Sequence, residues 1–405
     1  MIPFSPPDIR DEDIDAVVSV LTSGWITSGP VGRTLSDELA AWCDTPDAVL
    51  VSSATTGLEA VLRFLGVGPG DEVITTSYTY SASAAAIAHV GARPILLDTA
   101  PGSFVPEPAA YAHALTERTA AVLPVDLGGV PYDYVALREA LHDAGADVPI
   151  IADAAHSLGA ERTGVRSGAL ADFTVFSFHA VKNLTTAEGG AITWRSRSDP
   201  NLVVPEALEG LDDAEVARQL TLGILHGQSK SALDKTRAGS WEYDIEQLGH
   251  KANMPDILAA LGLSQLRRYE QTLARRAELV AAYDRALAPL GVTSLAHEGD
   301  DFTSSRHLYL VELPGDADRD AAHALEQRRN AIIMGLAERG VMANVHYKPL
   351  PLLRAYRDLG WNIADFPHAY RQYCGVISLP LHTLLTDEQV DEVADALEAE
   401  LTASR

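Results

Sequence analysis

The residue that could do the most chemistry in this 405-residue chain is Lys182. It stands among apolar side chains in FSFHAVKNLTTAEGG (176–190), and Ser177 precedes it in the same stretch. A lysine that is partly removed from water has a lowered pKa and becomes a nucleophilic amine. The commonest use of such an amine is to form an imine with an aldehyde cofactor. We therefore take Lys182 as the candidate catalytic lysine.

A second stretch, VSSATTGLEAVL (51–62), has the form of a phosphate-binding site. A strand is expected to end at Ser53 and a helix to begin near Thr55. The first amides of a helix lack intrahelical partners and carry the positive end of its dipole, so they bind anions. Ser53, Thr55 and Thr56 add hydroxyl groups, and Gly57 would permit close approach. The alternative is ordinary capping of the helix by serine and threonine.

An acidic residue stands in VPIIADAAHSLGA (148–160), with His156 three residues beyond it. Asp153 ends an apolar run that predicts a buried strand, at the carboxyl edge where α/β sheets bind ligands. A buried carboxylate must be paired, and a protonated ring nitrogen would pair it. The alternative is that Asp153 caps a following helix.

These stretches together match what pyridoxal phosphate requires of a protein. The cofactor needs a lysine, a phosphate cradle, an acid at its ring nitrogen and a group stacked on its ring. The chain offers them in the order residues 53–57, Tyr80, Asp153, and Ser177 with Lys182. The combination is far more specific than any member, and it predicts pyridoxal phosphate as the cofactor. No histidine shows metal-ligand spacing, so no metal is expected.

The elements that must position these residues follow an alternating pattern. Between residues 48 and 153 the apolar runs AVLVSS, VITT, RPILLDT, AAVLPVD and VPIIAD alternate with helical patterns. This alternation predicts a mainly parallel sheet with helices on both faces. Two further strands are expected at FTVFSF and GGAITW, on either side of Lys182.

The second half of the chain predicts a different arrangement. One long helix is expected from 254 to 289, as a connector between domains. After it, the strands HLYLVEL and VMANVHY mix with the helices ALEQRRNAIIMGLAERG and DEQVDEVADALEAEL. We therefore predict a large α/β domain with an N-terminal segment over 1–250, and a connecting helix with a small α+β domain over 251–405.

Composition excludes several classes of protein. The net charge of −25 disfavours nucleic acid as a partner, because such binding depends on neutralising phosphates. A local positive pocket could still hold a small anion. The two cysteines, Cys43 and Cys374, suit a reducing compartment. The sequence shows no signal peptide and no membrane span, so a cytoplasmic location is expected.

The chain resembles the DegT/DnrJ/EryC1/StrS family of nucleotide-sugar aminotransferases, which have the fold-type I architecture of pyridoxal phosphate enzymes. The resemblance covers nearly the whole chain. Its marks are SGWITSGP (23–30), SSATTG (52–57), GDEVITTSYTY (70–80), DAAHSLGA (153–160), FSFHAVKNLTTAEGG (176–190), HG (226–227), GHKANMPDI (249–257), HYKPL (346–350) and SLPLH (378–382).

The resemblance implies a role for each cofactor residue. Lys182 would hold the cofactor as an imine and move protons, and Asp153 would keep the ring nitrogen protonated. Tyr80 would stack on the ring, and His156 would hydrogen-bond the ring hydroxyl. The phosphate would be held by Ser53, the Ala54 and Thr55 amides, the Ser177 hydroxyl, and Lys251 and Asn253 of the GHKAN segment.

The family builds its site across a two-fold axis, so the resemblance implies a homodimer in which GHKAN reaches the neighbouring subunit's phosphate. The family often has asparagine at the place of Lys251. The expected substrate residues are Trp25, Thr27, His179, His346 and Tyr347, although His346 could equally be a structural histidine. Asp126 and Pro351 also depart from the family pattern and are expected at the substrate pocket or its rim.

The resemblance implies transfer of an amino group from an amino acid, expected to be L-glutamate, to a keto sugar nucleotide. Relatives that act at C4 tend to have DAAH and SFHxxKNxTxxEGG, as here, which indicates C4 of a dTDP-linked 4-keto-6-deoxyhexose for an antibiotic or surface glycan. The alternatives are a C3-specific aminotransferase and a non-catalytic sugar-binding or regulatory protein. A sugar dehydratase is disfavoured, because those relatives have histidine in place of Lys182.

Overall fold

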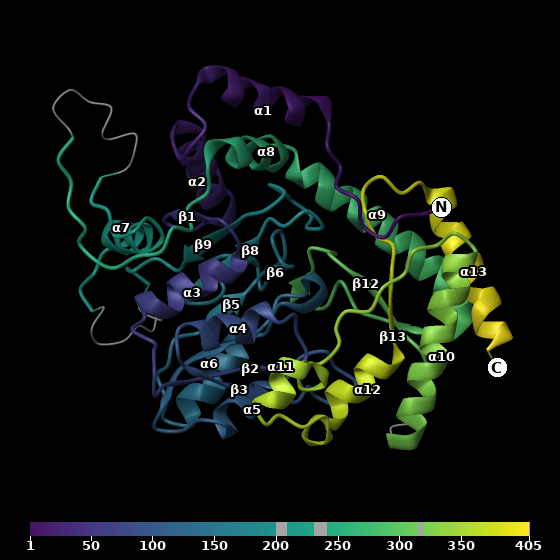
Figure 1. Cartoon of the computed structure of the whole chain (residues 1–405). Helices are drawn as coiled ribbons and strands as arrows, with labels where there is room; N and C mark the ends of the chain where they lie inside the picture. The colour runs from purple at the N-terminus through teal and green to yellow at the C-terminus, as the bar shows by residue number, and fades with distance from the viewer. Residues whose placement is uncertain (200–208, 231–240, 315–318, 405) are drawn as a thin grey trace.

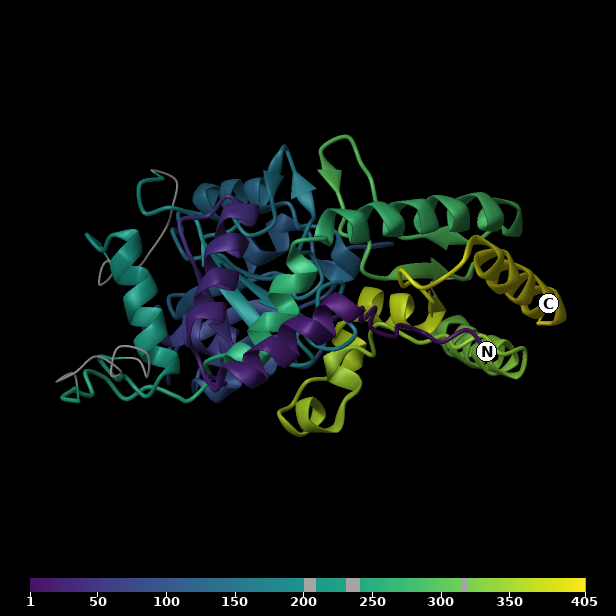
Figure 2. The same cartoon turned by 90° about the horizontal axis from the view of Figure 1, so that it is seen from above.

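The computed structural model describes residues 1–199, 209–230, 241–314 and 319–404. The molecule is elongated, with a larger part built around a central sheet and a smaller part at one end (Figures 1 and 2). Both termini lie in the smaller part, beside helices α10 (Arg319–Glu338) and α13 (Asp387–Ala403). Helix α9 (Tyr269–Leu287) runs from the larger part into the smaller one.

The central sheet is mainly parallel, as predicted. Two sets of strands, β3-β2-β4 and β5-β8-β9-β1, are joined by parallel bridges from Val122 to Ile150 and from Val125 to Asp153. Among the described strands of this sheet, β9 alone runs antiparallel to two neighbours, β8 and β1. The strands are β1 (Ala48–Val51), β2 (Glu72–Thr76), β3 (Arg93–Leu97), β4 (Thr119–Leu123), β5 (Ile151–Asp153), β8 (Phe173–Ser177) and β9 (Gly190–Trp194).

Helices cover both faces of this sheet, because successive strand residues point to opposite sides. Ile74 of β2 packs in one core with Leu35, and its neighbour Val73 packs in another with Leu58. The first core takes residues of α2 (Pro30–Cys43), α5 (Pro108–His113), α6 (Tyr134–Asp143) and α8 (Asp256–Leu266). The second takes residues of α3 (Ala54–Phe64), α4 (Ala82–His89) and α7 (Asp213–Ile224).

The smaller part packs helices on an antiparallel sheet of order β10-β12-β13. Its elements include β10 (Thr293–Ser294), β12 (Tyr309–Glu312), β13 (Val376–Leu379), α11 (Arg354–Asp358) and α12 (Pro367–Gly375). A separate small sheet has the strand order β11-β6-β7 and is not hydrogen-bonded to a strand of either larger sheet. Its strands are β6 (Glu161–Arg162), β7 (Val165–Arg166) and β11 (Phe302–Thr303). The strand predicted at HLYLVEL is confirmed as β12. The one predicted at VMANVHY is wrong, because Val341 and Asn344 there make only isolated bridges.

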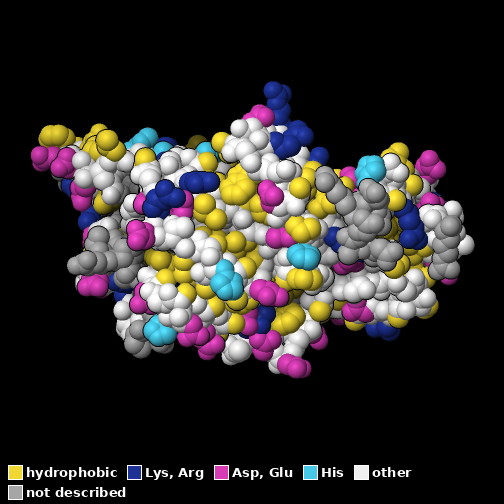
Figure 3. Space-filling view, turned by 90° about the horizontal axis from the view of Figure 1, so that it is seen from below, with side chains coloured by type: hydrophobic (Ala, Val, Ile, Leu, Met, Phe, Trp, Pro, Cys, Tyr) yellow, Lys and Arg dark blue, Asp and Glu magenta, His cyan; other side chains and the backbone are white. Residues whose placement is uncertain are grey.

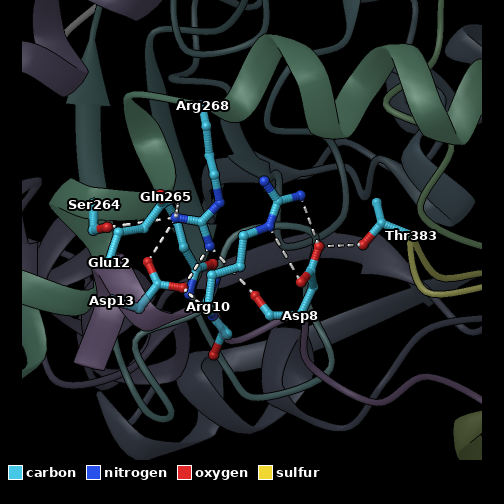
Figure 4. Close-up of polar contacts among 9 residues, drawn as sticks. Asp8, Arg10, Glu12, Asp13, Ser264, Gln265, Arg268 and Thr383 are labelled. Carbon is cyan, nitrogen blue, oxygen red and sulfur yellow. Dashed lines mark hydrogen bonds and ion pairs between the residues drawn. The ribbon is translucent and has the colours of Figure 1, made fainter. Parts of the chain in front are cut away.

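The single helix predicted from 254 to 289 is also wrong: α8 and α9 are separate. Arg268 between them leaves the helical conformation, with φ −113° and ψ 12°. Its guanidinium lies 2.6 Å from one oxygen of Asp13 and 2.5 Å from the other, and both residues are buried (Figure 4). Asp13 belongs to α1 (Asp11–Ser23), which packs along α8. Periodicity did not reveal this break, where Arg268 pairs with a residue that is far away in the sequence.

The division of the chain near residue 250 stays a proposal. Helix α8 contributes Ala259 and Leu266 to a core of the central sheet, so part of the predicted C-terminal domain packs with the larger part. The smaller part has its own core, which α9, α10 and α13 share with β12 and β13.

The surface carries the excess of acidic residues. On the face seen in Figure 3, acidic side chains are spread across the molecule and hydrophobic ones gather toward its middle. No helix in the described ranges is long and apolar enough to span a membrane.

Candidate active site

One pocket gathers most of the residues that the sequence singles out. It lies at the ends of β5 and β8 and at the start of α3, and Tyr347 of the smaller part closes one side. The predicted residues that line it are Ser53, Ala54, Thr55, Tyr80, Asp153, His156, Ser177, His179, Lys182, His346 and Tyr347. Residues separated by almost three hundred positions in the sequence therefore meet at one site.

The start of α3 has free donors for an anion. Ser53 caps the helix, since its hydroxyl accepts from the Thr56 amide at 3.2 Å, so the capping alternative is correct for this hydroxyl. The Ala54 and Thr55 amides, however, donate no hydrogen bond to any residue that the structure describes. Two amides at a helix N-terminus, both lining the pocket, remain available to a phosphate.

Two glycines near this helix serve packing. A Cβ on Gly57 would lie 2.8 Å from a Val175 methyl, so Gly57 lets α3 approach the sheet and does not face the pocket. A Cβ on Gly190 would lie 2.5 Å from the Phe176 carbonyl oxygen and 3.0 Å from the Ala54 nitrogen. A side chain at Gly190 would therefore push on the backbone that presents the free amides.

Asp153 is buried, with 5% of its surface exposed, and no helix follows β5 directly, so it is not a helix cap. The Ser83 hydroxyl donates to one carboxylate oxygen at 2.6 Å, and the Ala155 amide donates to the other at 3.2 Å. Burial raises the pKa of Asp153, while these two hydrogen bonds and the Lys182 charge oppose the increase. Ser83 is not among the residues predicted from the sequence, because it carries no signal there beyond lying three residues after Tyr80.

Lys182 lies on the loop between β8 and β9, and it is half-buried in the pocket. Burial lowers the pKa of its ammonium group to about 8, and the Asp153 carboxylate offsets part of the effect. The amine can thus lose its proton near neutral pH, as a nucleophile or general base must.

Long-range hydrogen bonds hold the lysine loop in place. Directly after Lys182, the Asn183 side-chain amide donates to the Ser305 carbonyl at 2.8 Å. Further along, the Thr185 backbone amide donates to the Gln265 side chain of α8 at 2.9 Å. The loop is therefore anchored to both the segment leading into β12 and the helix beside α1, where Figure 4 shows Gln265 next to Arg268.

Aromatic and imidazole rings form another wall of the pocket. His156 contacts the Gly128 amide through Nδ1, at 3.2 Å, and the Tyr347 hydroxyl through Nε2, at 3.0 Å. His346 lines the pocket while its Nδ1 lies 2.8 Å from the Ser378 hydroxyl, so it is both a pocket residue and a structurally bonded one. Tyr80 is 65% exposed at the rim, with its ring 6.0 Å from that of Tyr347.

Four predicted site residues lie outside the lining of this pocket: Trp25, Thr27, Lys251 and Asn253. They gather in a second group near the start of α2. The Lys251 ammonium contacts the Asn253 side chain, which in turn donates to the Ser28 hydroxyl. The Trp25 indole donates to the Ser28 carbonyl at 3.2 Å, and the Thr27 carbonyl accepts from the Asp256 backbone amide at 3.1 Å.

The expectation that Asp126 and Pro351 touch the pocket or its rim is wrong, because both are buried outside the pocket lining. Asp126 accepts from the Ser157 hydroxyl at 2.5 Å and from the Tyr134 hydroxyl at 2.6 Å. Burial raises the pKa of its carboxyl to about 6. A buried acid with dedicated donors is a structural group, so its departure from the family pattern says nothing about the substrate.

The residues present fit pyridoxal phosphate. The pocket combines an amine of lowered pKa, a buried carboxylate with fixed hydrogen bonds, and two free helix amides. These are the partners that the aldehyde, the ring nitrogen and the phosphate of this cofactor need. Together with the strand order, they define the fold and site of a fold-type I, pyridoxal phosphate-dependent aminotransferase.

Comparison with known proteins gives the family. The sequence profile of the DegT/DnrJ/EryC1/StrS aminotransferase family matches residues 7–398, and the chain belongs to this family. Its sequence is 35% identical to the spore coat polysaccharide biosynthesis protein SpsC of Bacillus subtilis (strain 168), over 98% of this chain and 96% of that protein.

Solved structures agree with this assignment. A Streptococcus pneumoniae protein assigned as a sugar aminotransferase, in its PMP form, matches with a TM-score of 0.91 and 42% identity over 100% of both chains. Helicobacter pylori PseC, an aminotransferase involved in the biosynthesis of pseudoaminic acid, matches with a TM-score of 0.85 and 27% identity over 99% of both chains.

Proposed function

We propose that this chain uses pyridoxal 5′-phosphate to move an amino group from L-glutamate to C4 of a dTDP-linked 4-keto-6-deoxyhexose. The product would be an amino sugar for an antibiotic or a surface glycan. The observation that carries the proposal is the meeting of Lys182 and Asp153 in one pocket with the free amides of α3. A non-catalytic binding protein would have no need of an amine whose pKa is lowered to about 8.

Each group has a task that its surroundings support. Ala54 and Thr55 would bind the phosphate together with the Ser53 and Ser177 hydroxyls, and Tyr80 would cover the ring from the rim. Two hydrogen-bond donors and Lys182 favour the ionised form of Asp153 against the effect of burial, and Asp153 would keep the ring nitrogen protonated. The bound cofactor supplies an electron sink for proton removal from carbon. Lys182 would take that proton and return it, as a positioned general base and acid.

The preference for C4 depends on residues beside the lysine. His179 and Glu188, two marks of the C4 type, both line the pocket, and the His179 Nε2 lies 3.8 Å from a Glu188 carboxylate oxygen. Thr185, a third mark, is buried under the loop, where its hydroxyl donates to the Phe178 carbonyl at 3.0 Å. Of these three marks beside the lysine, His179 and Glu188 are placed to contact a sugar, and we assign the choice of C4 to them.

We further propose that the enzyme is a homodimer in the cytoplasm. Lys251 and Asn253 lie outside the pocket of their own subunit, and Trp25 and Thr27 lie near them. A two-fold axis would let this second group serve the pocket of the partner, with Lys251 near the cofactor phosphate and Trp25 and Thr27 near the sugar. His346 and Tyr347 would complete the sugar-binding side from within the subunit.

The relatives favour a polysaccharide or surface sugar as the end product. The name of SpsC places it in spore coat polysaccharide biosynthesis, and PseC takes part in the biosynthesis of pseudoaminic acid. Neither name states the sugar that this chain uses, so the substrate class above rests on the residues of the pocket.

A panel of keto-sugar nucleotides tests the proposal. Purified enzyme with pyridoxal phosphate and L-glutamate would be offered dTDP-linked 4-keto-6-deoxy and 3-keto-6-deoxy hexoses, and the aminated carbon would be located by NMR. We expect amination of the 4-keto sugar at C4 alone. Conversion of the 3-keto sugar in preference to its isomer would contradict the C4 assignment.

A further inference from the structure

Asp256, the first residue of α8, holds the start of α2 in place. Its carboxylate accepts from three backbone amides: Gly29 at 2.7 Å and Gly32 at 3.0 Å through Oδ1, and Val31 at 3.1 Å through Oδ2. Its own backbone amide donates to the Thr27 carbonyl at 3.1 Å. Asp256 is 1% exposed, and α2 and α8 pack side by side (Figure 1). One buried carboxylate therefore fixes the segment that leads into α2.

The three amides are donors that α2 cannot satisfy by itself. The first amides of a helix lack intrahelical acceptors, and the N-cap residue of α2, Gly29, has no side chain to offer. Pro30 follows it and has no amide hydrogen. Asp256 thus takes the place of a capping side chain, and its negative charge suits the positive end of the helix dipole. The sequence gives no sign of this cap, because Asp256 lies 227 positions from Gly29.

Ser28 connects the fixed segment to the side chain of Asn253. The Ser28 hydroxyl donates its one proton to the Met254 carbonyl at 2.6 Å, so it must accept from the Asn253 side-chain nitrogen. This orientation turns the Asn253 side-chain oxygen toward the Lys251 ammonium, which can only donate. The reverse orientation would set the amide nitrogen and the ammonium, both donors, against each other. The two contacts therefore agree on how Asn253 lies.

The backbone of the GHKAN segment places Lys251 and Asn253 on one side. The segment runs along the end of β1, with a bridge between Val51 and Asn253 and a hydrogen bond from the Ser52 amide to the Ala252 carbonyl at 2.6 Å. Alternate residues of an extended segment point to the same side. Ala252 packs in the core that α3 and α7 share, so Lys251 and Asn253 point the other way.

We propose that Asp256 and Ser28 are positioning residues that direct the Lys251 ammonium toward the cofactor phosphate of the partner subunit. This inference rests on the proposed function, which places Lys251 at that phosphate. An ammonium has three protons to give and Asn253 takes one, so two remain for phosphate oxygens. Lys251 is exposed, and a long side chain that is already held loses less conformational entropy when it binds.

The affinity of the full-length dimer for added cofactor tests the proposal without turnover. The bound cofactor would first be removed, and the Kd for pyridoxal phosphate would then be measured by absorbance. Lys251→Ala should raise this Kd by more than about tenfold, because it removes a charged donor to the phosphate. Ser28→Ala should raise it by about fivefold, since Lys251 remains but is no longer held. The matched control is Ser36→Ala on the same helix, whose hydroxyl donates to the Ala48 carbonyl, and it should bind as the wild type does.

Two comparisons separate positioning from general damage to the fold. Pyridoxal, which has the same ring and no phosphate, should bind Ser28→Ala and the wild type equally. In a Lys251→Ala background, Ser28→Ala should cause no further loss of affinity for pyridoxal phosphate, because Ser28 acts through Lys251. Additive losses in the double variant, or an equal loss for pyridoxal, would overturn the proposal.

The single variants also show which proposal fails. Weak binding by Lys251→Ala together with full affinity in Ser28→Ala would overturn the positioning role and leave Lys251 at the phosphate. Full affinity in Lys251→Ala would overturn the placement of Lys251 in the proposed function, and the positioning role with it.

Hydrogen exchange tests the role of Asp256 in the wild-type protein, so it does not require a variant that folds. The amides of Gly29, Val31 and Gly32 should exchange slowly if the carboxylate holds them, whereas free amides at a helix start exchange fast. Asp256→Asn offers one oxygen in place of two, so it should speed their exchange and weaken pyridoxal phosphate binding as Ser28→Ala does. Fast exchange of the three amides in the wild type would overturn the proposal.

Discussion

Asp153 and Lys182 line the same pocket, and each stabilises the ionised form of the other. The lysine lowers the pKa of a carboxyl that burial raises, and the carboxylate raises the pKa of an ammonium that burial lowers. Burial is the larger effect on both residues, so neither is tightly paired. A loosely paired acid and amine can each turn to a ligand, which is what an enzyme with a bound ring cofactor requires.

Lys182→Ala should fold and yet lose turnover by more than about 10³-fold, because no other group in the pocket can serve as the amine and the proton carrier. Borohydride treatment of the wild-type holoenzyme, followed by peptide mass spectrometry, should find the cofactor fixed to Lys182. The exposed Lys348 supplies the control, and Lys348→Ala should keep both properties. Fixation to a different lysine would show that the wrong residue has been chosen.

Ser83→Ala should raise the pKa of Asp153, because the Ser83 hydroxyl hydrogen bond is the main influence that lowers it. A hydrogen bond to a charged group stabilises it by about 1.5–3 kcal/mol, which corresponds to a shift of about one pH unit or more. The acid limb of the kcat/KM profile should move to higher pH by that amount. Ser81→Ala is the control, since its hydroxyl bonds Tyr356 and not Asp153. An unmoved acid limb in Ser83→Ala would remove Asp153 from the pH profile.

Because His297 is buried, we expect the folded protein to lose stability in mild acid. Burial and two nearby arginines lower its pKa from 6.5 to about 3. Below pH 6.5, His297 therefore binds a proton in the unfolded chain but not in the folded chain. Its contribution to the free energy of unfolding is full above pH 6.5 and is lost as the pH falls toward 3. Between pH 6.5 and 5.0 this amounts to about 1.5 kcal/mol.

The measurement for His297 is the drop in melting temperature between pH 6.5 and 5.0. His297→Gln should show a smaller drop than the wild type, while His142→Gln, at an exposed position, should match the wild type. The other buried histidines contribute equally to all three proteins and cancel. Equal drops in His297→Gln and the wild type would mean that His297 is not buried in its neutral form.

Mixed dimers test whether the second group serves the partner's pocket. Lys182→Ala and Lys251→Glu should each be inactive or weak alone, because one lacks the amine and the other repels the phosphate. Subunits mixed after gentle dissociation should regain activity, since half of the dimers carry one intact site when pairing is random. Sedimentation should show dimers throughout. Full activity in a monomer, or no recovery on mixing, would place Lys251 outside the site.

The sequence predicts the architecture well where local pattern and topology agree. Apolar runs between helical patterns predict the parallel sheet, and strand ends carry Asp153 and Ser177 to one edge. The sequence does not predict features that involve contacts between residues far apart in the chain. At the break between α8 and α9, Arg268 pairs with Asp13, about 250 positions away, and no glycine or proline marks the break. The segment 341–347 has the composition of a strand but pairs only through isolated bridges.

The same distinction applies to the site. Lys182, Asp153 and the start of α3 could be found because each has a motif with a chemical reason. Ser83 and Gly128 could not, because their roles arise from which groups meet across the fold. Asp126 was predicted as a pocket residue because it departs from the family pattern. In the structure it is instead a buried acid that accepts a hydrogen bond from Tyr134.

A single-turnover experiment tests the central claim most directly. Holoenzyme would be incubated with [¹⁵N]glutamate, freed of donor by desalting, and then mixed with a dTDP-4-keto-6-deoxyhexose. We predict that one equivalent of ¹⁵N per active site appears on C4 of the sugar in the NMR spectrum. Absence of ¹⁵N from the sugar, or its appearance on C3 when a 3-keto isomer is offered instead, would contradict the account.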